Sequence, residues 1–464
     1  MTHRFFYAFL LLTLWLPWPW GSVLGWSVYL FCGASFSLLL WVLLQRPLMD
    51  LPHWQAEGSQ PLRYLAYLWL ALLGGLALQL IPLPANWVQT LSPARWAIVA
   101  PYGADWLPLS ATPVETFQYW MLSAAYGAFF WVALHALSDR RRLRLFLWAV
   151  VINAVISTVY GVLVLLGGAA FEPIALLNTN NRVLSGPFVG RNNFAGFLAL
   201  SASLGIGLLL AEMRPSGERT WREWLRDTLR LLLSRKVTLR LMIVILVAGL
   251  VLTRSRMGNT AFLSATCVAG FLWFLRSGGS RRLALILFVS FILVDVYIIG
   301  SVVGLDRVVE RIQATETQSE LRVDINADAL EYGADYWAWG SGADSFDQVF
   351  PVYKSVYGSG LINQAHNEYL QFILELGVVL GVLTLAIGAF SAWQGGQALW
   401  RRKSRFYRSV ALGSVMAFVY LAIHSTADFN LRIPANAALF VAIMALMWRA
   451  RYTPSKGSRT GSSL

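Results

Sequence analysis

His366, Asn367 and Glu368 stand together at the start of the apolar stretch AHNEYLQFILELG, residues 365–377. A histidine or a glutamate can take a proton from an attacking hydroxyl group. The start of a helix offers unpaired backbone N–H groups and partial positive charge, which suit an anionic ligand. Two interpretations remain: the triplet serves a reaction on an anionic substrate, or His366 and Asn367 only cap a helix at a membrane surface. We expect the stretch to continue without a break into one apolar helix.

Three arginines at the edges of apolar segments are candidates to bind phosphate: Arg191, Arg254 and Arg256. The first lies in GPFVGRNNFAGFLAL (186–200), and the others lie in the short connection TRSRMGN (253–259). A guanidinium group makes planar bidentate contacts with phosphate or carboxylate, which a lysine cannot make. The alternative for each arginine is snorkelling or a structural ion pair. The same region adds two candidate substrate-binding side chains, Arg182 and Asn193.

A third polar group lies in HSTADFNLRIPANA, residues 424–437, between two apolar runs. Its polar density predicts a lined cavity, in which His424 and Arg432 are candidate substrate-binding residues. A local ion pair between Asp428 and Arg432 is the safer structural interpretation, since the two lie four positions apart. Glu375 lies inside an apolar run, where an ionisable group is expected to face the protein interior and to be protonated or paired.

The amino-acid composition indicates which kind of secondary structure positions these residues. Hydrophobic residues make up 57% of the 464 positions and charged residues only 13%, with a mean hydropathy of +0.56. Apolar runs of about 20 residues recur, each long enough to cross a bilayer. We therefore predict an all-α integral membrane protein with about twelve transmembrane helices. The predicted spans are 6–20, 22–45, 64–84, 116–137, 144–168, 189–212, 238–253, 259–276, 283–304, 366–392, 408–424 and 433–448.

The distribution of positive charge predicts the orientation in the membrane. Twelve spans place both termini on one side, and the loops of that side carry 27 of the 37 Lys and Arg residues. The positive-inside rule makes this side cytoplasmic, so both termini lie inside and the candidate site faces the opposite, outer side. Topology thus explains the net charge of +13, and no nucleic-acid-binding motif accompanies it.

Four parts of the chain follow from these spans. Residues 1–304 form a bundle of spans one to nine, 305–365 a periplasmic subdomain, 366–448 spans ten to twelve, and 449–464 a cytoplasmic tail. Within the subdomain, SELRVDINADALEY (319–332) predicts a helix that places Ala329 and Tyr332 on its apolar stripe and ends at Gly333.

Two further segments are predicted at the periplasmic face. WGSGADSF (339–346) is predicted to form a turn rather than a phosphate-binding loop, since neither a flanking strand nor a suitable lysine accompanies it. The Pro- and Trp-rich segment 84–115 is predicted to lie against the membrane surface.

The motifs GPFVGRNNFAGFLAL, SRMG, WGSGADSFDQVFPVY and AHNEYLQFILELG resemble those of the O-antigen ligase family, over roughly residues 180–437. The superfamily also contains O-antigen and exopolysaccharide polymerases and protein O-oligosaccharyltransferases. The resemblance implies a GT-C-like fold and a metal-independent glycosyltransferase. It maps the family's catalytic residues onto His366, Arg191 and Arg256. Met257 departs from the small residue that many members have after the arginine.

The resemblance further implies a bacterial inner membrane, a site on its periplasmic face, and an undecaprenyl-diphosphate-linked glycan as the donor. Arg254, Asn367 and Glu368 are additional candidate substrate-binding residues because of their positions in the sequence. The family does not share one acceptor; we expect a sugar hydroxyl, on a glycan or on lipid A-core, as in a ligase or a polymerase. Alternatives are a protein O-oligosaccharyltransferase of the same superfamily and a transporter or flippase of lipid-linked sugars. No cofactor and no metal is expected, because no Asp-rich pair or His/Cys ligand spacing is present in the sequence.

Overall fold

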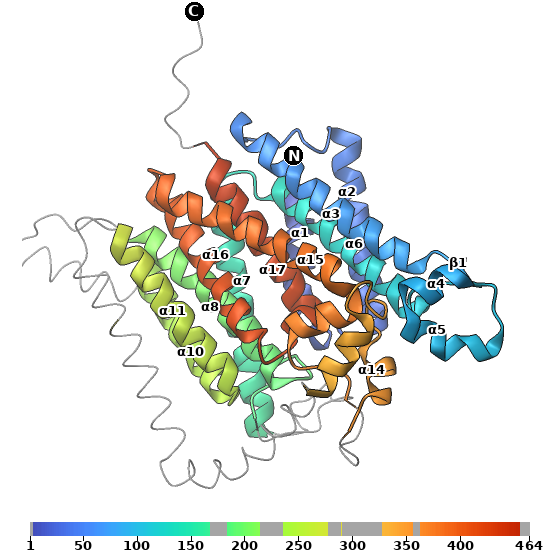
Figure 1. Cartoon of the computed structure of the whole chain (residues 1–464). Helices are drawn as coiled ribbons and strands as arrows, with labels where there is room; N and C mark the ends of the chain where they lie inside the picture. The colour runs from blue at the N-terminus through green and yellow to red at the C-terminus, as the bar shows by residue number, and fades with distance from the viewer. Residues whose placement is uncertain are drawn as a thin grey trace, which may run out of the picture.

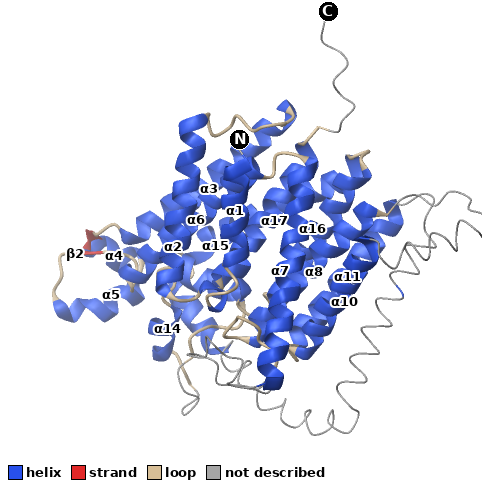
Figure 2. Ribbon diagram, turned by 180° about the vertical axis from the view of Figure 1, so that it is seen from behind, coloured by secondary structure: helices blue, strands red, loops and turns tan. Residues whose placement is uncertain are grey.

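The computed structural model describes residues 3–167, 183–213, 235–276, 289, 327–355 and 362–454. Within these ranges the chain forms a bundle of long helices with a single two-stranded sheet (Figures 1 and 2). The long helices are α1 (His3–Trp15), α2 (Gly25–Gln45), α3 (Ser59–Leu80), α6 (Pro113–Ala136), α7 (Arg140–Gly167), α8 (Arg191–Glu212), α10 (Arg235–Leu252), α11 (Arg256–Arg276), α15 (Glu368–Arg401), α16 (Arg405–His424) and α17 (Pro434–Tyr452).

Seven described helices are long and apolar enough to cross a membrane, and Val237–Leu252 is a shorter apolar helix. This confirms an all-α, multi-pass membrane protein. The long helices occupy eleven of the twelve predicted span positions. The predicted ninth span, 283–304, lies outside the described residues except for Val289. The count of twelve spans therefore stays a prediction.

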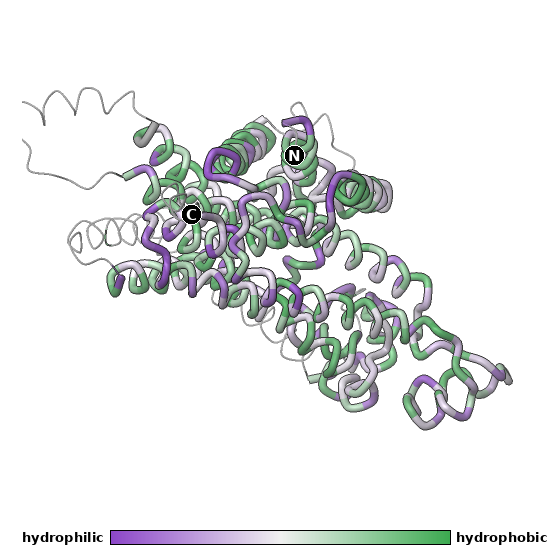
Figure 3. The backbone as a smooth tube through the Cα atoms, turned by 90° about the horizontal axis from the view of Figure 1, so that it is seen from above, coloured by the Kyte–Doolittle hydropathy of each residue, from purple (hydrophilic) through white to green (hydrophobic). Residues whose placement is uncertain are grey.

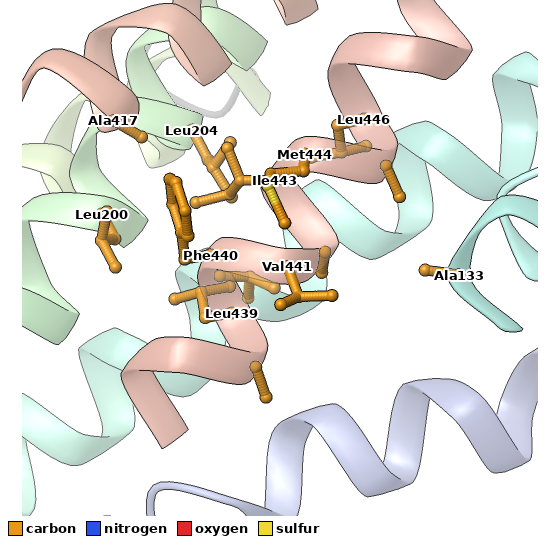
Figure 4. Close-up of a cluster of buried hydrophobic side chains, with 14 of the residues drawn as sticks. Ala133, Leu200, Leu204, Ala417, Leu439, Phe440, Val441, Ile443, Met444 and Leu446 are labelled. Carbon is orange, nitrogen blue, oxygen red and sulfur yellow. The ribbon is translucent and has the colours of Figure 1, made fainter. Parts of the chain in front are cut away.

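The centre of the bundle is formed by α8, α16 and α17. In Figure 4, side chains of α17 such as Phe440 and Ile443 lie among Leu200 and Leu204 of α8 and Ala417 of α16. Glycines allow α8 and α16 to approach closely: a Cβ added at Gly207 would lie 3.0 Å from the Cα of Gly413. Small residues at such crossings are typical of helices that pack in membranes.

The two ends of the bundle differ in chemistry. At one end, which we call the basic end, Arg140 lies over the ring of Phe406, and the backbone N–H of Gln55 bonds to the carbonyl of Tyr452. The opposite end, which we call the polar end, contains residues 183–191, 253–256, 362–368 and 425–433, together with 327–355. Loops that the sequence assigned to one side of the membrane thus meet at one end. Figure 3 shows many hydrophobic residues along the helices of the bundle.

Residues of the predicted periplasmic subdomain form a small second core at the polar end. A helix covers residues 327–336, and α14 (Phe346–Val349) follows. Ala329 and Tyr332 are buried in this core, as the apolar stripe predicted. The predicted helix end at Gly333 is wrong, because the helix continues to Tyr336. Residues 319–326 of the predicted helix lie outside the described ranges.

The segment after α3 forms a hairpin that projects from the bundle (Figures 1 and 3). Strand β1 (Leu83–Pro84) pairs antiparallel with β2 (Trp106–Leu107), and the short helices α4 (Ala85–Leu91) and α5 (Pro93–Val99) lie between them. The predicted third span was placed too late in the chain: its helix begins at Ser59 and ends at Leu80.

Candidate active site

The start of α15 presents His366 beside a conventional helix cap. Asn367 is the N-cap, and its Oδ1 accepts the backbone N–H of Leu370 at 3.2 Å. His366 precedes the cap with a left-handed backbone, φ 52°, which is uncommon for a residue with a side chain. Its half-buried ring lies edge-on to Phe429, with 5.1 Å between ring centroids. The capping interpretation therefore holds for Asn367, while His366 is held outside the helix.

Backbone N–H groups at the start of α15 are largely committed within the protein. The N–H of Glu368 donates to the carbonyl of Ser425 at 2.9 Å, and that of Leu370 donates to the Asn367 cap. The expectation that this helix start offers a set of unpaired N–H groups is therefore wrong for these two positions. Charge on an anionic ligand has to be neutralised mainly by side chains.

Glu368 is buried, with 1% of its surface exposed, and connects α15 to the loop between α16 and α17. One carboxylate oxygen accepts the hydroxyl of Ser425, and the other accepts the backbone N–H of Leu431. Both oxygens are thus occupied by neighbours. This geometry favours His366 over Glu368 as the group that meets a substrate.

Arg432 lies between two carboxylates rather than beside Asp428. Its guanidinium donates to Oε2 of Glu375, which is fully buried, and to Oδ1 of Asp344 at 3.0 Å. The guanidinium also lies over the rings of Tyr119 and Phe372, at 5.3 and 5.9 Å from their centroids. The expectation that Glu375 is paired in the interior is confirmed.

The predicted local pair between Asp428 and Arg432 is wrong. Arg432 belongs to the short 3-10 turn η6 (Asn430–Arg432), so the four-residue spacing does not place the two side chains on one α-helical face. Burial on its own lowers the pKa of a guanidinium, but Glu375, with Tyr119 and Asp344, raises the pKa of Arg432 above its ordinary value. Arg432 therefore stays charged and committed to the carboxylates.

The chain of α15 is broken at Gly377, which contradicts the predicted continuous helix. Gly377 has φ 76° and ψ 166°, a conformation open almost only to glycine. Backbone groups freed by the break bond to the 337–345 segment: the N–H of Val378 donates to Trp337 at 2.7 Å, and the carbonyl of Glu375 accepts the N–H of Gly342 at 3.0 Å. The predicted turn at 339–346 is confirmed. Its residues provide hydrogen-bond partners for the backbone groups that the break in α15 leaves free.

His424 is fully buried at the end of α16. Its Nδ1 lies 2.7 Å from the Tyr420 hydroxyl and 2.9 Å from Nδ2 of Asn430, and its Nε2 lies 3.6 Å from Asp428. Asn436 continues this network, donating to Oδ1 of Asn430 at 3.1 Å. Because His424 is fully buried in this arrangement, a bulky glycan does not contact it.

Asn436 also connects the network to α8. Its Nδ2 donates to the backbone carbonyl of Asn193 at 2.8 Å, and the side chain of Asn193 is itself buried. The close approach requires Gly196, because a Cβ there would overlap Oδ1 of Asn430. The network therefore fixes the start of α8, where Arg191 lies, relative to the loop that holds Glu368.

The three candidate arginines are exposed at the polar end. Arg191 is the first residue of α8, and Arg256 is the first residue of α11. Arg254 has a left-handed backbone, φ 53°, in the tight connection that the sequence predicted. Ser255 caps α11 by accepting the N–H of Gly258 at 3.2 Å, and a Cβ on Gly258 would lie 3.0 Å from that of Ala195 in α8. The starts of α8 and α11 therefore lie close together.

Sequence reasoning placed most of the candidate residues at one end, and the structure brings their elements together there. Arg182 lies outside the described residues. Several polar-end residues had not been singled out as candidates: Tyr119, Asp344, Gln371 and Asn436. Gln371 bonds to the nearby Gln364 and Glu375, but other partners lie far away in sequence, as for Arg432 and Asp344, 88 positions apart. The spacing of residues in the sequence does not predict a contact between such distant positions.

A family model described as O-Antigen ligase matches residues 241–385. Over this segment the chain is similar to the O-antigen ligase family. The match confirms the resemblance and contains most of α10, all of α11, His366 and the break at Gly377. Arg191 and the 424–437 segment lie outside the matched residues. No curated protein matches the chain.

Proposed function

We propose that this O-antigen ligase-like protein is an inner-membrane glycosyltransferase that acts at the periplasmic face. It transfers a glycan from undecaprenyl diphosphate to a sugar hydroxyl, without a metal, as a ligase or polymerase does. The observation that carries the proposal is the family match, which contains Arg254, Arg256 and His366. The fold supports it, since the starts of α8, α11 and α15 all lie at the polar end.

Arg191 and Arg256 are proposed to hold the donor diphosphate. Each is exposed at the first position of a helix, where the helix dipole is positive. The start of a helix also stabilises an anion bound beside it. Two guanidinium groups can neutralise the diphosphate as it leaves.

His366 is proposed to act as the general base. The acceptor hydroxyl oxygen forms a bond to the anomeric carbon of the donor sugar, and the bond from that carbon to the diphosphate oxygen breaks. The diphosphate keeps the electron pair of the broken bond, and the hydroxyl proton moves to the His366 ring. Undecaprenyl diphosphate then leaves with its charge neutralised by the arginines.

The test is conversion by the purified protein in vesicles supplied with an undecaprenyl-diphosphate-linked glycan. We expect a new glycosidic bond and free undecaprenyl diphosphate in equal amounts. Supplying lipid A-core, a second lipid-linked glycan or a Ser/Thr-containing polypeptide separates the ligase, polymerase and protein-glycosylating reactions. Movement of the intact donor across the membrane, with no bond cleaved under any condition, would replace the transferase by a transporter.

A further inference from the structure

The projecting hairpin, residues 83–107, exposes several large aromatic and aliphatic side chains on its outer side, together with a few polar ones. Trp87, Ile98, Tyr102 and Trp106 are 58%, 46%, 83% and 64% exposed. The hairpin continues from the end of α3 and returns towards the start of α6, at the polar end (Figure 1). An apolar face of this kind needs a partner unless it lies in lipid.

The inner face of the hairpin is anchored, so the outer face is a defined surface. Val88 is buried, and Ala94 packs against the second core formed by residues 329–374. Arg95, the next residue, is half-buried. The backbone N–H of Ala85 donates to the carbonyl of Asp105 at 2.8 Å. The hairpin therefore has a fixed side and an exposed side.

The low charge content of the hairpin indicates that its exposed side faces lipid rather than water. Residues 83–107 contain one cation, Arg95, and one anion, Asp105. A surface that faces water carries charges of both signs at a much higher density. Tryptophan and tyrosine are enriched where a membrane meets water, because their rings are apolar and their N–H or O–H group needs a polar partner.

The apolar surface of the bundle continues into this face. At the end of α3, Ile81 is 48% exposed, and at the start of α6, Val114 and Phe117 are 64% and 52% exposed. These residues border the hairpin in sequence. The side of the bundle that contacts lipid therefore leads directly to the hairpin face.

We propose that residues 83–107 form an interfacial platform, whose aromatic face lies among the lipid headgroups on the membrane side where the polar end opens. The platform would hold residues 327–355 at a fixed height over the bilayer, through Ala94. The inference needs only that the bundle spans a membrane, and it does not depend on the transferase reaction.

Single cysteines carrying an environment-sensitive fluorophore test this placement. Cys32 and Cys267 are first replaced by alanine, and the probe is then placed by Tyr102→Cys, Gln348→Cys or Leu70→Cys. Gln348 is exposed at the polar end in α14, and Leu70 is 63% exposed in the middle of α3. The labelled proteins are reconstituted in vesicles of phosphatidylcholine and phosphatidylglycerol that carry a nitroxide on the headgroup or near the end of the acyl chain.

We expect the headgroup nitroxide to quench the Tyr102 probe several-fold more than the Gln348 probe. The acyl-end nitroxide should quench the Leu70 probe most strongly. Equal headgroup quenching at positions 102 and 348 would overturn the platform, as would acyl-end quenching at position 102 that matches position 70. A Leu70 probe that the acyl-end nitroxide leaves unquenched would overturn the membrane insertion on which the inference rests.

Discussion

Arg432 and Arg256 lie at the same end of the bundle, and both were predicted to contact the substrate, yet their surroundings differ. The Arg432 side chain is 8% exposed, lies over two aromatic rings and donates to Glu375 and Asp344. Arg256 is exposed at the first position of α11. A cation fixed between carboxylates holds the fold together, whereas a cation at the positive end of a helix stands where an anion is stabilised.

The two histidines of the polar end repeat this contrast. His424 is fully buried and contacts Tyr420 and Asn430. His366 is half-buried on a left-handed residue outside its helix. In both pairs the buried residue contributes to the scaffold, and the more exposed residue is the one proposed to meet the substrate. We propose on this basis that Arg432 and His424 position the site rather than bind the substrate.

Arg432→Met gives the largest expected loss of stability. The change leaves the buried Glu375 carboxylate without its cation, so we expect the free energy of unfolding to fall by about 3–5 kcal/mol. Thermal unfolding in detergent measures this effect. Arg254→Met is the matched control, because Arg254 is exposed, and it should change the unfolding free energy by less than about 0.5 kcal/mol. Equal stability of the two variants would show that the buried pair does not hold the fold.

Arg191→Ala and Arg256→Ala should show the opposite behaviour, with normal stability and little transfer. Loss of one preorganised charge at the diphosphate is expected to lower turnover by roughly 10²–10³-fold. Lysine at either position should restore activity only in part, since it keeps the charge but loses the bidentate contact. Glycan transfer and thermal unfolding are measured on the same preparations. Full activity of both alanine variants would make these residues snorkelling surface arginines.

Gly377→Ala tests the broken helix with a smaller expected effect. A Cβ at this position would overlap the carbonyl oxygen of Ala338, and φ 76° is itself unfavourable for alanine. We expect the free energy of unfolding to fall by about 1–3 kcal/mol. Gly396→Ala, in the same helix and with nothing within 4 Å of the added Cβ, should be neutral or slightly stabilising. Equal effects of the two substitutions would mean that the break at Gly377 tolerates a side chain.

Chelation is expected to have no effect. The proposed reaction neutralises the leaving diphosphate with arginine side chains, so EDTA should leave the rate of glycan transfer unchanged. The measurement compares initial rates before and after dialysis against EDTA. Loss of activity that Mg²⁺ restores would show that a metal shares the role given to Arg191 and Arg256.

The parts of the fold that depend on local pattern were predictable from the sequence. Apolar runs gave the positions of the described long helices, and the stripe through Ala329 and Tyr332 gave the buried side of a subdomain helix. Asn367 matches its predicted role as a cap because an N-cap interacts only with the next few residues.

The remaining features depend on contacts between distant segments. Gly377 lies in an apolar run whose pattern predicts an uninterrupted helix. The break is stable because residues 337–342 form hydrogen bonds with the backbone groups that it frees. The spacing of Asp428 and Arg432 suggested a local pair, but their partners are His424 for one and Glu375 and Asp344 for the other. Such choices are decided by packing, which the spacing of residues in the sequence does not encode.

The role of His366 is tested most directly by measuring donor binding and turnover separately for His366→Ala in vesicles. If the histidine is the base, donor affinity should be largely kept, and turnover at saturating donor should fall by about two to four orders of magnitude. Glu368→Gln should lower turnover less, because Glu368 is bonded to Ser425 and Leu431. Weak donor binding with normal turnover at saturating donor would contradict the account and make His366 a binding group.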